Sequence, residues 1–510
     1  MYNGVMIDGQ GLTIDQVVQV ARFGAKVALT EGAKERIIRA RKFVDELVDS
    51  KKVVYGITTG FGKFSDVVIS KEETTDLQTN LIISHACGVG NPFSEEIVRA
   101  IMLLRVNNLA KGHSGVELKT AETLVQMLNE GVHPIIPEKG SLGASGDLAP
   151  LSHMVLVMLG LGEAIYAGER MSGAEAMKRA GIPSIQLTSK EGLALINGTQ
   201  VMTAVGLITA YEAMQLVKLS DVSAAMTVEA LRGITDAFDP RLHQVRPHQG
   251  QINTASNMLR ILEGSSLTTR QGEIRVQDAY TLRCIPQIHG ASKDALNYIV
   301  ERINIEINAV TDNPILFPED GVVFSGGNFH GQPMALPFDF LGIALSEVAN
   351  VAERRIERLV NPQLSGLPAF LTPHGGLHSG FMIAQYAAAA LVSENKVLAH
   401  PASVDSIPSS ANQEDHVSMG TIAARKAKEI LFNAQNVIAI ELLCAAQAID
   451  FGDAAGLGVG TRKAYDIIRS EVAKIQEDRV MNVDFEKIYG IIKSNQIITE
   501  VEKALGELAI

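Results

Sequence analysis

The chain has 510 residues, of which 46% are hydrophobic and 20% are charged, and its formal net charge is −12. This composition predicts a large buried core and excludes disordered and low-complexity classes. The acidic balance and the lack of Lys/Arg runs argue against a nucleic-acid partner.

The first residues contain no basic segment followed by an apolar run, so we expect no secretory signal. One long uncharged stretch, residues 192–211, calls for a membrane test, but it contains several polar side chains and is too polar for a membrane span. The three cysteines are far apart and form no CxxC pair, which predicts a reducing compartment and no disulfides (Cys87, Cys284, Cys444). We therefore expect a soluble, cytoplasmic protein without a membrane partner.

The predicted elements change along the chain from loops and turns to long helices. The N-terminal third is rich in glycine turns, and short strand candidates occur at 52–55, 57–59 and 322–324. From about residue 195 helical periodicity dominates, with apolar residues at three- and four-residue spacing over 341–359. Residues 421–451 lack both Gly and Pro, which predicts one long helix. We expect a mainly α fold, with an N-terminal region (1–200) and a long-helix bundle (201–510) that form one functional unit.

The segment from Gly143 to Pro150 contains three consecutive small residues, Ala144-Ser145-Gly146. Small side chains and a glycine allow a backbone nitrogen to fold back onto a carbonyl two residues upstream. The alternative is an ordinary helix start, with Ser145 or Asp147 as the N-cap.

Other polar residues stand beside glycines or inside apolar runs. Tyr55 begins a glycine-rich loop and offers a phenol for proton transfer. Asn197–Gln200 places amides in an apolar run, either as a satisfied core network or as polar groups of a site. Tyr280 and Arg283 share a helix face, and Arg283 either clamps a substrate carboxylate or pairs with an acidic side chain.

Several enzyme classes lack their motifs in this chain. Glu414, Asp415 and His416 form a weak candidate for a metal site, because helical spacing does not point all three one way. No HExxH, Cys/His zinc spacing or Walker lysine is present, and the glycines of 456–460 follow no strand. We therefore expect neither a metal site nor an ATPase or dehydrogenase.

Taken together, the motifs resemble the histidine ammonia-lyase family, within the wider aromatic amino acid ammonia-lyases and aminomutases. The matching segments are 55–62, 84–90, 140–150, 197–200, 277–290, 311–314, 325–333 and 406–420. They occur in the family's order. The resemblance implies a mainly α fold of the fumarase/aspartase-like superfamily.

The resemblance implies a cofactor made from the chain itself. Gly146 nitrogen attacks the Ala144 carbonyl carbon, and the loss of two waters gives a methylidene-imidazolone (MIO) with an alkene at Ser145. No ordinary side chain supplies such an electrophile. The implied reaction is non-oxidative removal of ammonia from L-histidine to give trans-urocanate, the first step of histidine degradation.

The resemblance also assigns roles to individual residues. Tyr55 becomes a candidate base, Tyr280 assists near the MIO, and Arg283 binds the substrate carboxylate. The remaining residues are placed at the cofactor (Gly143, Asp147, Asn197, Phe329) or lining the substrate pocket (Gln277, Asn313).

His85 and Glu414 resemble the groups that recognise an imidazole ring. Relatives specific for phenylalanine or tyrosine usually carry glutamine at the position of Glu414 and lack the Ser84-His85 pair. A site that hydrogen-bonds polar ring atoms rejects a plain phenyl ring, because its buried polar groups then lose their partners. This implies histidine as the substrate.

Thr58 departs from the asparagine common in histidine ammonia-lyases. Threonine there is typical of the phenylalanine and tyrosine branch and of aminomutases, so a histidine 2,3-aminomutase and a tyrosine or phenylalanine ammonia-lyase stay open. A catalytically silent helical scaffold is the non-enzyme alternative. The resemblance further implies a homotetramer whose active sites draw residues from three chains.

Overall fold

The structure is a computed structural model that describes residues 4–50, 54, 56, 57, 59 and 74–510. The chain folds into two structural units. Unit 1 comprises residues 1–208, 300–339 and 401–425, and unit 2 comprises residues 209–299, 340–400 and 426–510. The predicted regions 1–200 and 201–510 follow chain order, whereas each unit combines three separate segments.

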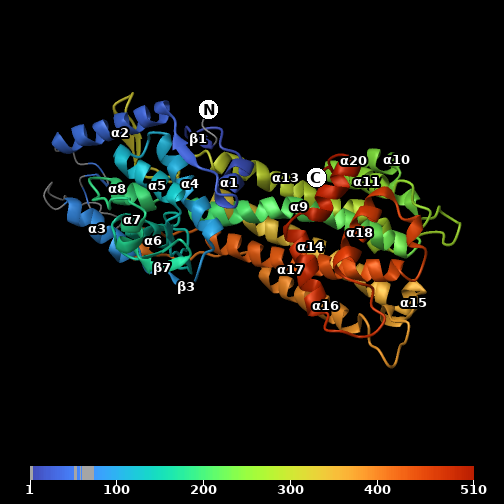
Figure 1. The fold of residues 1–510 in the computed structure, drawn as a ribbon. Coiled ribbons are helices and arrows are strands. Elements are labelled where there is room, and N and C mark those ends of the chain that lie inside the picture. The colour runs from blue at the N-terminus through green and yellow to red at the C-terminus, as the bar shows by residue number, and fades with distance from the viewer. Residues whose placement is uncertain (1–3, 51–53, 55, 58, 60–73) are drawn as a thin grey trace. The chain divides into compact units, whose positions relative to one another are not determined.

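Unit 1 contains short strands and helices of moderate length (Figure 1). Its helices are α1 (Ile14–Ala21), α2 (Glu31–Asp49), α3 (Thr74–His85), α4 (Glu95–Ala110), α5 (Leu118–Glu130), α6 (Leu148–Met158), α7 (Gly173–Arg179) and α8 (Glu191–Ile196). Its strands are β1 (Val5–Ile7), β2 (Val27–Leu29), β3 (Val89–Pro92), β4 (His133–Pro134), β5 (Pro137–Lys139), β6 (Glu163–Tyr166), β7 (Glu169–Ser172), β8 (Ile315–Phe317) and β9 (Val322–Phe324).

The strands of unit 1 form small sheets. β1 pairs with β2 in parallel, whereas β3–β5, β4–β6–β7 and β8–β9 are antiparallel. The strand predicted at 322–324 is β9. The candidates at 52–55 and 57–59 include residues outside the described part of the chain.

Unit 2 is built from helices. The short ones are α10 (Pro240–Gln244), α12 (Tyr280–Arg283) and α15 (Pro362–Ser365), and the longer ones are α11 (Gln249–Ile261), α16 (Met382–Leu398), α18 (Val459–Glu471), α19 (Asn482–Lys493) and α20 (Gln496–Leu505). Four of the five unit boundaries fall within the longest described helices, which are α9 (Gln200–Ala230), α13 (Ile285–Glu306), α14 (Gln332–Val360) and α17 (Gly420–Ile449), and the fifth lies after α16, between residues 400 and 401. The expected mainly α fold is confirmed.

The two long helices predicted from periodicity are present. The pattern over 341–359 belongs to α14, which ends just before Pro362, and the stretch 421–451 corresponds to α17. In unit 2 these helices lie beside α16, because Gln385 on α16 bonds Glu353 on α14 at 2.8 Å and Asn433 on α17 bonds Asn395 on α16 at 2.9 Å (Figure 1).

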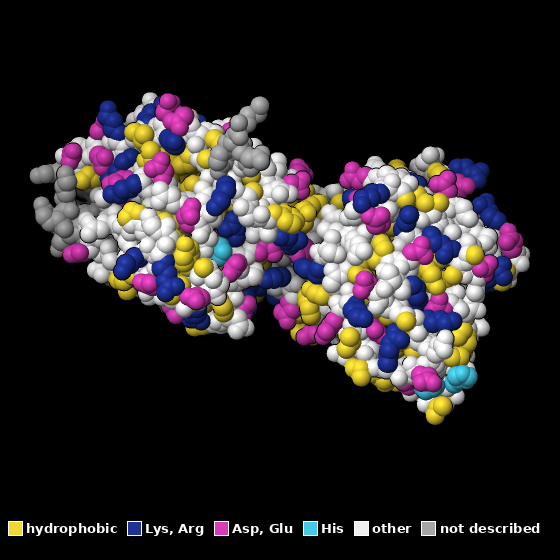
Figure 2. All heavy atoms as spheres, in the orientation of Figure 1, with side chains coloured by type: hydrophobic (Ala, Val, Ile, Leu, Met, Phe, Trp, Pro, Cys, Tyr) yellow, Lys and Arg dark blue, Asp and Glu magenta, His cyan; other side chains and the backbone are white. Residues whose placement is uncertain are grey.

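Both α14 and α17 are long and apolar enough to pass a membrane-span test by composition. However, 67% and 83% of the residues in their most apolar windows are buried inside the protein, which is the pattern of core helices. The face shown in Figure 2 carries interspersed Lys/Arg and Asp/Glu side chains without a large basic area.

Candidate active site

The loop of residues 143–147 lies in unit 1, between β5 and the start of α6. Gly143 and Gly146 adopt positive φ angles of 70° and 75°, where a side chain is disfavoured. A Cβ on Gly146 would lie 2.1 Å from the carbonyl oxygen of Gly198, so only glycine permits this approach. The loop therefore presses its backbone against the segment that precedes α9.

Asn197 connects that segment to the loop. Its side-chain Nδ2 donates to the carbonyl oxygen of Ser145 at 3.0 Å, and the backbone N–H of Asp147 donates to the Gly198 carbonyl at 2.7 Å. Asn197 is buried, and its side-chain Oδ1 has no hydrogen-bond partner among the described residues. The sequence left two interpretations of these amides, a satisfied core network or polar groups of a site. The contact of Asn197 with the Ser145 carbonyl favours the second.

Asp147 occupies the N-cap position of α6, yet its carboxylate accepts hydrogen bonds from the first turn of a different helix, α9. Oδ2 accepts the backbone N–H groups of Val201 and Met202 at 3.0 and 2.9 Å, in the first turn of α9. Oδ1 accepts the hydroxyls of Ser141 and Thr421. Burial raises the pKa of Asp147, and these hydrogen bonds oppose that shift.

Glu414 reaches the loop from a strained turn. Its Oε1 accepts the Ser145 hydroxyl at 2.9 Å, and its Oε2 accepts the Ser409 hydroxyl at 2.7 Å. The residues between Ser409 and Glu414 include three consecutive non-glycine residues with positive φ, namely Ser410 (50°), Ala411 (53°) and Asn412 (66°). Such conformations cost about 1 kcal/mol or more each, and they cluster at functional sites.

His85 ends α3 near Glu414. Burial lowers the pKa of its half-buried imidazole, and the nearby Glu414 carboxylate opposes that shift. The ring Nδ1 lies 3.1 Å from the hydroxyl of Ser84. The structure thus brings together the two residues expected to recognise a substrate ring.

Asn313 and Phe329 also lie in unit 1. Asn313 is buried and accepts the backbone N–H of Gly326 at 2.7 Å, which links the turn before β8 to the loop after β9. Phe329 is half-buried in that same loop. Among the described residues, no hydrogen bond joins either side chain to the 143–147 loop.

Gln277, Tyr280 and Arg283 form a separate cluster in unit 2. Arg283 Nη1 donates to Gln277 Oε1 at 2.7 Å, and its guanidinium carbon lies 4.7 Å from the centre of the Tyr280 ring. Within the part of the chain that the structure describes, no carboxylate lies within ion-pair distance of Arg283, whose Nε also lacks a partner. The sequence left two interpretations of Arg283, a clamp for a substrate carboxylate or a partner in an internal ion pair. This geometry favours the clamp.

Some of the expected residues, and others that sequence reasoning missed, need separate mention. Tyr55 and Thr58 lie outside the described residues. Ser409 and Thr421 were not predicted, although Ser409 stands in the polar segment noted around Glu414. Arg105, a buried side chain of α4 that donates to the carbonyl of Asn197, was not predicted either. Within the described chain, no group of three or more His, Cys, Asp or Glu residues is arranged to hold a metal ion.

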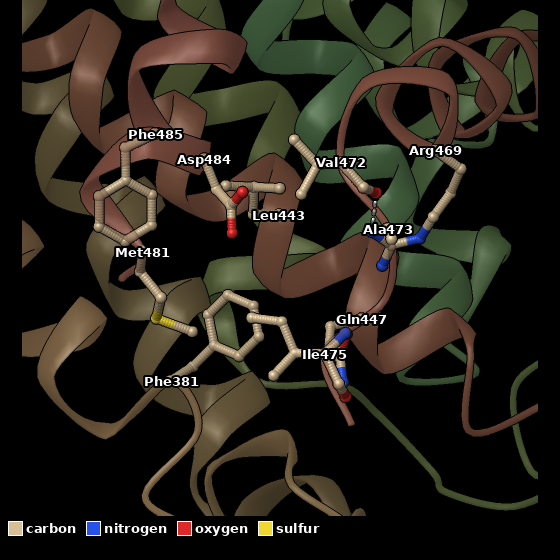
Figure 3. Close-up of a pocket in the computed structure, with 10 residues that line it drawn as sticks. All are labelled: Phe381, Leu443, Gln447, Arg469, Val472, Ala473, Ile475, Met481, Asp484 and Phe485. Atoms are coloured by element: carbon tan, nitrogen blue, oxygen red, sulfur yellow. Dashed lines mark hydrogen bonds between the residues drawn. The ribbon is translucent and has the colours of Figure 1, made fainter. Parts of the chain in front are cut away.

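A pocket in unit 2 offers little chemistry (Figure 3). It leaves no room for a water molecule, and Phe381, Met481 and Phe485 line one side. Its charged lining groups are paired, with Arg469 2.8 Å from Asp450 and Asp484 2.8 Å from Arg479. The loop in unit 1 remains the better candidate.

The family model for aromatic amino acid lyases matches residues 12–470. The chain belongs to the aromatic amino acid lyase family. It is accordingly an enzyme that breaks carbon–nitrogen bonds, which confirms the expected enzyme class, and the alternative of a silent scaffold is not favoured.

Individual relatives refine this placement. The chain is 70% identical over 501 residues to the histidine ammonia-lyase of Alkaliphilus oremlandii, covering 98% of this chain and 99% of that protein. The solved histidine ammonia-lyase of Trypanosoma cruzi shares 43% identity and a TM-score of 0.92, covering 98% and 96% of the two chains. The tyrosine aminomutase of Streptomyces globisporus shares 40% identity and a TM-score of 0.95, covering 99% and 100%. These likenesses confirm the expected fold.

Proposed function

We propose that this lyase removes ammonia from L-histidine to give trans-urocanate, using an MIO formed from Ala144, Ser145 and Gly146. The observation that carries the proposal is the meeting of Ser145 with Glu414 beside His85. The 70% identity to a histidine ammonia-lyase supports the same substrate.

The loop fits the cyclisation. The Gly146 nitrogen would attack the Ala144 carbonyl carbon, whose oxygen would leave as water, and Ser145 would lose its hydroxyl and α-proton as a second water. The Ser145 carbonyl survives as the ring carbonyl, and it already accepts the Asn197 N–H at 3.0 Å. When formed, the group supplies an alkene electrophile that makes the substrate amine a better leaving group.

The chain's own side chains account for substrate recognition. Glu414 would accept an imidazole N–H, and His85, whose pKa is lowered by burial, would bond the ring as a second polar partner. Arg283 has an unpaired guanidinium edge for the substrate carboxylate, and Tyr280 and Gln277 hold its orientation. Tyr55 remains the proposed base for the β-proton.

The test is purified enzyme with L-histidine, with urocanate absorbance and free ammonia followed in parallel and the intact mass measured. Equal urocanate and ammonia, with a mass lower by two waters, is the expected result. Consumption of histidine with little of either product would point to an aminomutase, and no consumption would overturn the substrate.

We also propose a cytoplasmic homotetramer with composite active sites. Residues 276–280, which lead into α12, leave two large side chains uncovered, with Val276 72% and Tyr280 69% exposed. Mixed oligomers of Ser145→Ala and Arg283→Ala chains test this arrangement. Activity recovered on co-expression of the two inactive chains is expected if Ser145 and Arg283 at one site come from different copies, and its absence in a verified mixed oligomer would refute it.

A further inference from the structure

A buried cation in unit 1 has no part in the reaction proposed above. Arg105 lies on α4 with no exposed surface. Its Nη1 donates to the carbonyl of Ala194 at 3.0 Å, and its Nη2 donates to the carbonyl of Asn197 at 2.9 Å and to Gln200 Oε1 at 2.5 Å. The guanidinium therefore binds the chain on both sides of the turn between α8 and α9.

That turn is the segment on which the Ser145 loop rests. The Asn197 carbonyl faces Arg105, while the Asn197 side chain donates to the Ser145 carbonyl. The next carbonyl, that of Gly198, accepts the N–H of Asp147 at 2.7 Å. Arg105 thus holds the carbonyl of the Asn197–Gly198 peptide, and the two contacts to the loop come from groups on either side of that peptide.

Space and charge both favour arginine at this position. A Cβ on Gly198 would come within 2.8 Å of Arg105 Nη2, so the guanidinium fits closely against the backbone. Burial lowers the pKa of Arg105 to about 10, and the Asp312 and Asp147 carboxylates oppose that shift. Lysine would keep the charge but would replace a planar fork of donors by one ammonium group.

We propose that Arg105 is a positioning residue that holds the Asn197–Gly198 peptide so that the Ser145 loop can cyclise and its ring carbonyl stays bonded. The inference rests on the proposed function, because it assigns a purpose to contacts with the cofactor-forming loop. It concerns residues that all belong to unit 1, in which α4, α6 and α8 lie (Figure 1).

The test compares Arg105→Lys with Arg99→Lys in the full-length enzyme. Arg99 is a matched control, since it lies six residues earlier on α4, is also buried, and also donates to backbone carbonyls, those of Val20 and Leu128 at 2.9 Å. The readouts are the fraction of chains whose mass is lower by two waters, the kcat per cyclised chain, and the KM.

We expect Arg105→Lys to lower the cyclised fraction and to lower kcat about tenfold or more, with KM changed little, because a misplaced group costs rate more than binding. Arg99→Lys should cyclise fully and keep its kcat even where its thermal stability falls. Equal cyclisation and kcat in the parent enzyme and Arg105→Lys would overturn the proposal, as would equal losses in the two variants.

A second variant keeps the proposal testable if Arg105→Lys does not fold. Gln200→Met removes one acceptor of the guanidinium and leaves both backbone carbonyls in place, so a smaller fall in the cyclised fraction is expected. Cyclisation equal to that of the parent would then overturn the inference. If the parent itself retained its full mass, the proposed function would fail instead, so the two failures are distinguishable.

Discussion

Both units contain buried ion pairs, among them Lys190–Asp312 at 2.8 Å in unit 1, but the buried charges around the Ser145 loop act differently from those between the long helices of unit 2. In unit 1, Asp147 and Arg105 bind backbone N–H and carbonyl groups of turns and helix ends around the Ser145 loop. In unit 2, the buried ions bind each other across long helices, with Arg355 paired to Glu441 at 2.5 Å and Lys293 to Asp221 at 2.5 Å.

This difference teaches what each set of charges does. Irregular backbone cannot satisfy its own polar groups, so unit 1 uses charged side chains to hold it in one conformation. Helices satisfy their own backbone, so the ions of unit 2 are left to specify which helix faces meet. Substitutions in unit 1 should therefore change chemistry first, and substitutions in unit 2 should change stability first.

The largest effect is expected for Ser145→Ala. Without the hydroxyl no alkene forms, and kcat should fall by roughly a thousandfold or more. Turnover and intact mass measure this. Ser152→Ala is the control, because that buried hydroxyl bonds only a carbonyl of its own helix, at 2.8 Å. Substantial turnover by Ser145→Ala would remove the MIO assignment.

Glu414→Gln should lower histidine turnover by about a hundredfold, because the amide keeps the shape of the side chain but loses the charge that binds an imidazole N–H. Turnover of phenylalanine or tyrosine should change much less. Asp415→Asn, an exposed neighbour, serves as the control. Equal losses for all substrates would contradict a role in reading the ring.

Arg355→Met tests the other side of the comparison. It leaves Glu441 buried and unpaired, which should cost about 3–5 kcal/mol of stability. The adjacent Arg354→Met removes a half-exposed guanidinium from the buried Glu353, to which Gln385 still donates at 2.8 Å, so it should cost less stability than Arg355→Met. Thermal unfolding measures both. Turnover per folded Arg355→Met chain should stay at the parent value, and a selective loss of kcat would break the contrast between the units.

The smallest effect concerns pH. Because burial lowers the pKa of His85, the ring is neutral at pH 7 and gains a proton only below the ordinary histidine range near about 6.5. We expect kcat/KM to be steady between about pH 7 and 8 and to fall in acid, as protonated His85 loses its acceptor. The ratio of parent to His85→Gln across pH cancels titration of the substrate. A flat ratio would show that His85 does not titrate in catalysis.

Local patterns predicted much of the architecture and part of the site. Periodicity and the absence of Gly and Pro predicted α14 and α17 to within a turn at their C-terminal ends. Small residues predicted a contorted loop at Ser145, because the steric limits on backbone angles are local. The pairing of Tyr280 with Arg283 followed from helical spacing alone.

Other features depended on residues far apart in the chain. Arg355 stands in a charge-rich segment, 353–358, and the structure buries it completely against Glu441. Asp147 looked like a helix cap for the residues that follow it, but its carboxylate caps α9. No local signal distinguishes a buried charge from an exposed one when its partner lies elsewhere in the sequence.

The sequence by itself determined the family, the helical fold and the small-residue loop, because these depend on local composition and on short motifs. Only the tertiary structure decided that Glu414 meets Ser145, that Asn197 meets the Ser145 carbonyl, and that Arg105 stands behind Asn197. The physical reason is that hydrogen bonds act over about 3 Å in space, whatever the separation along the chain.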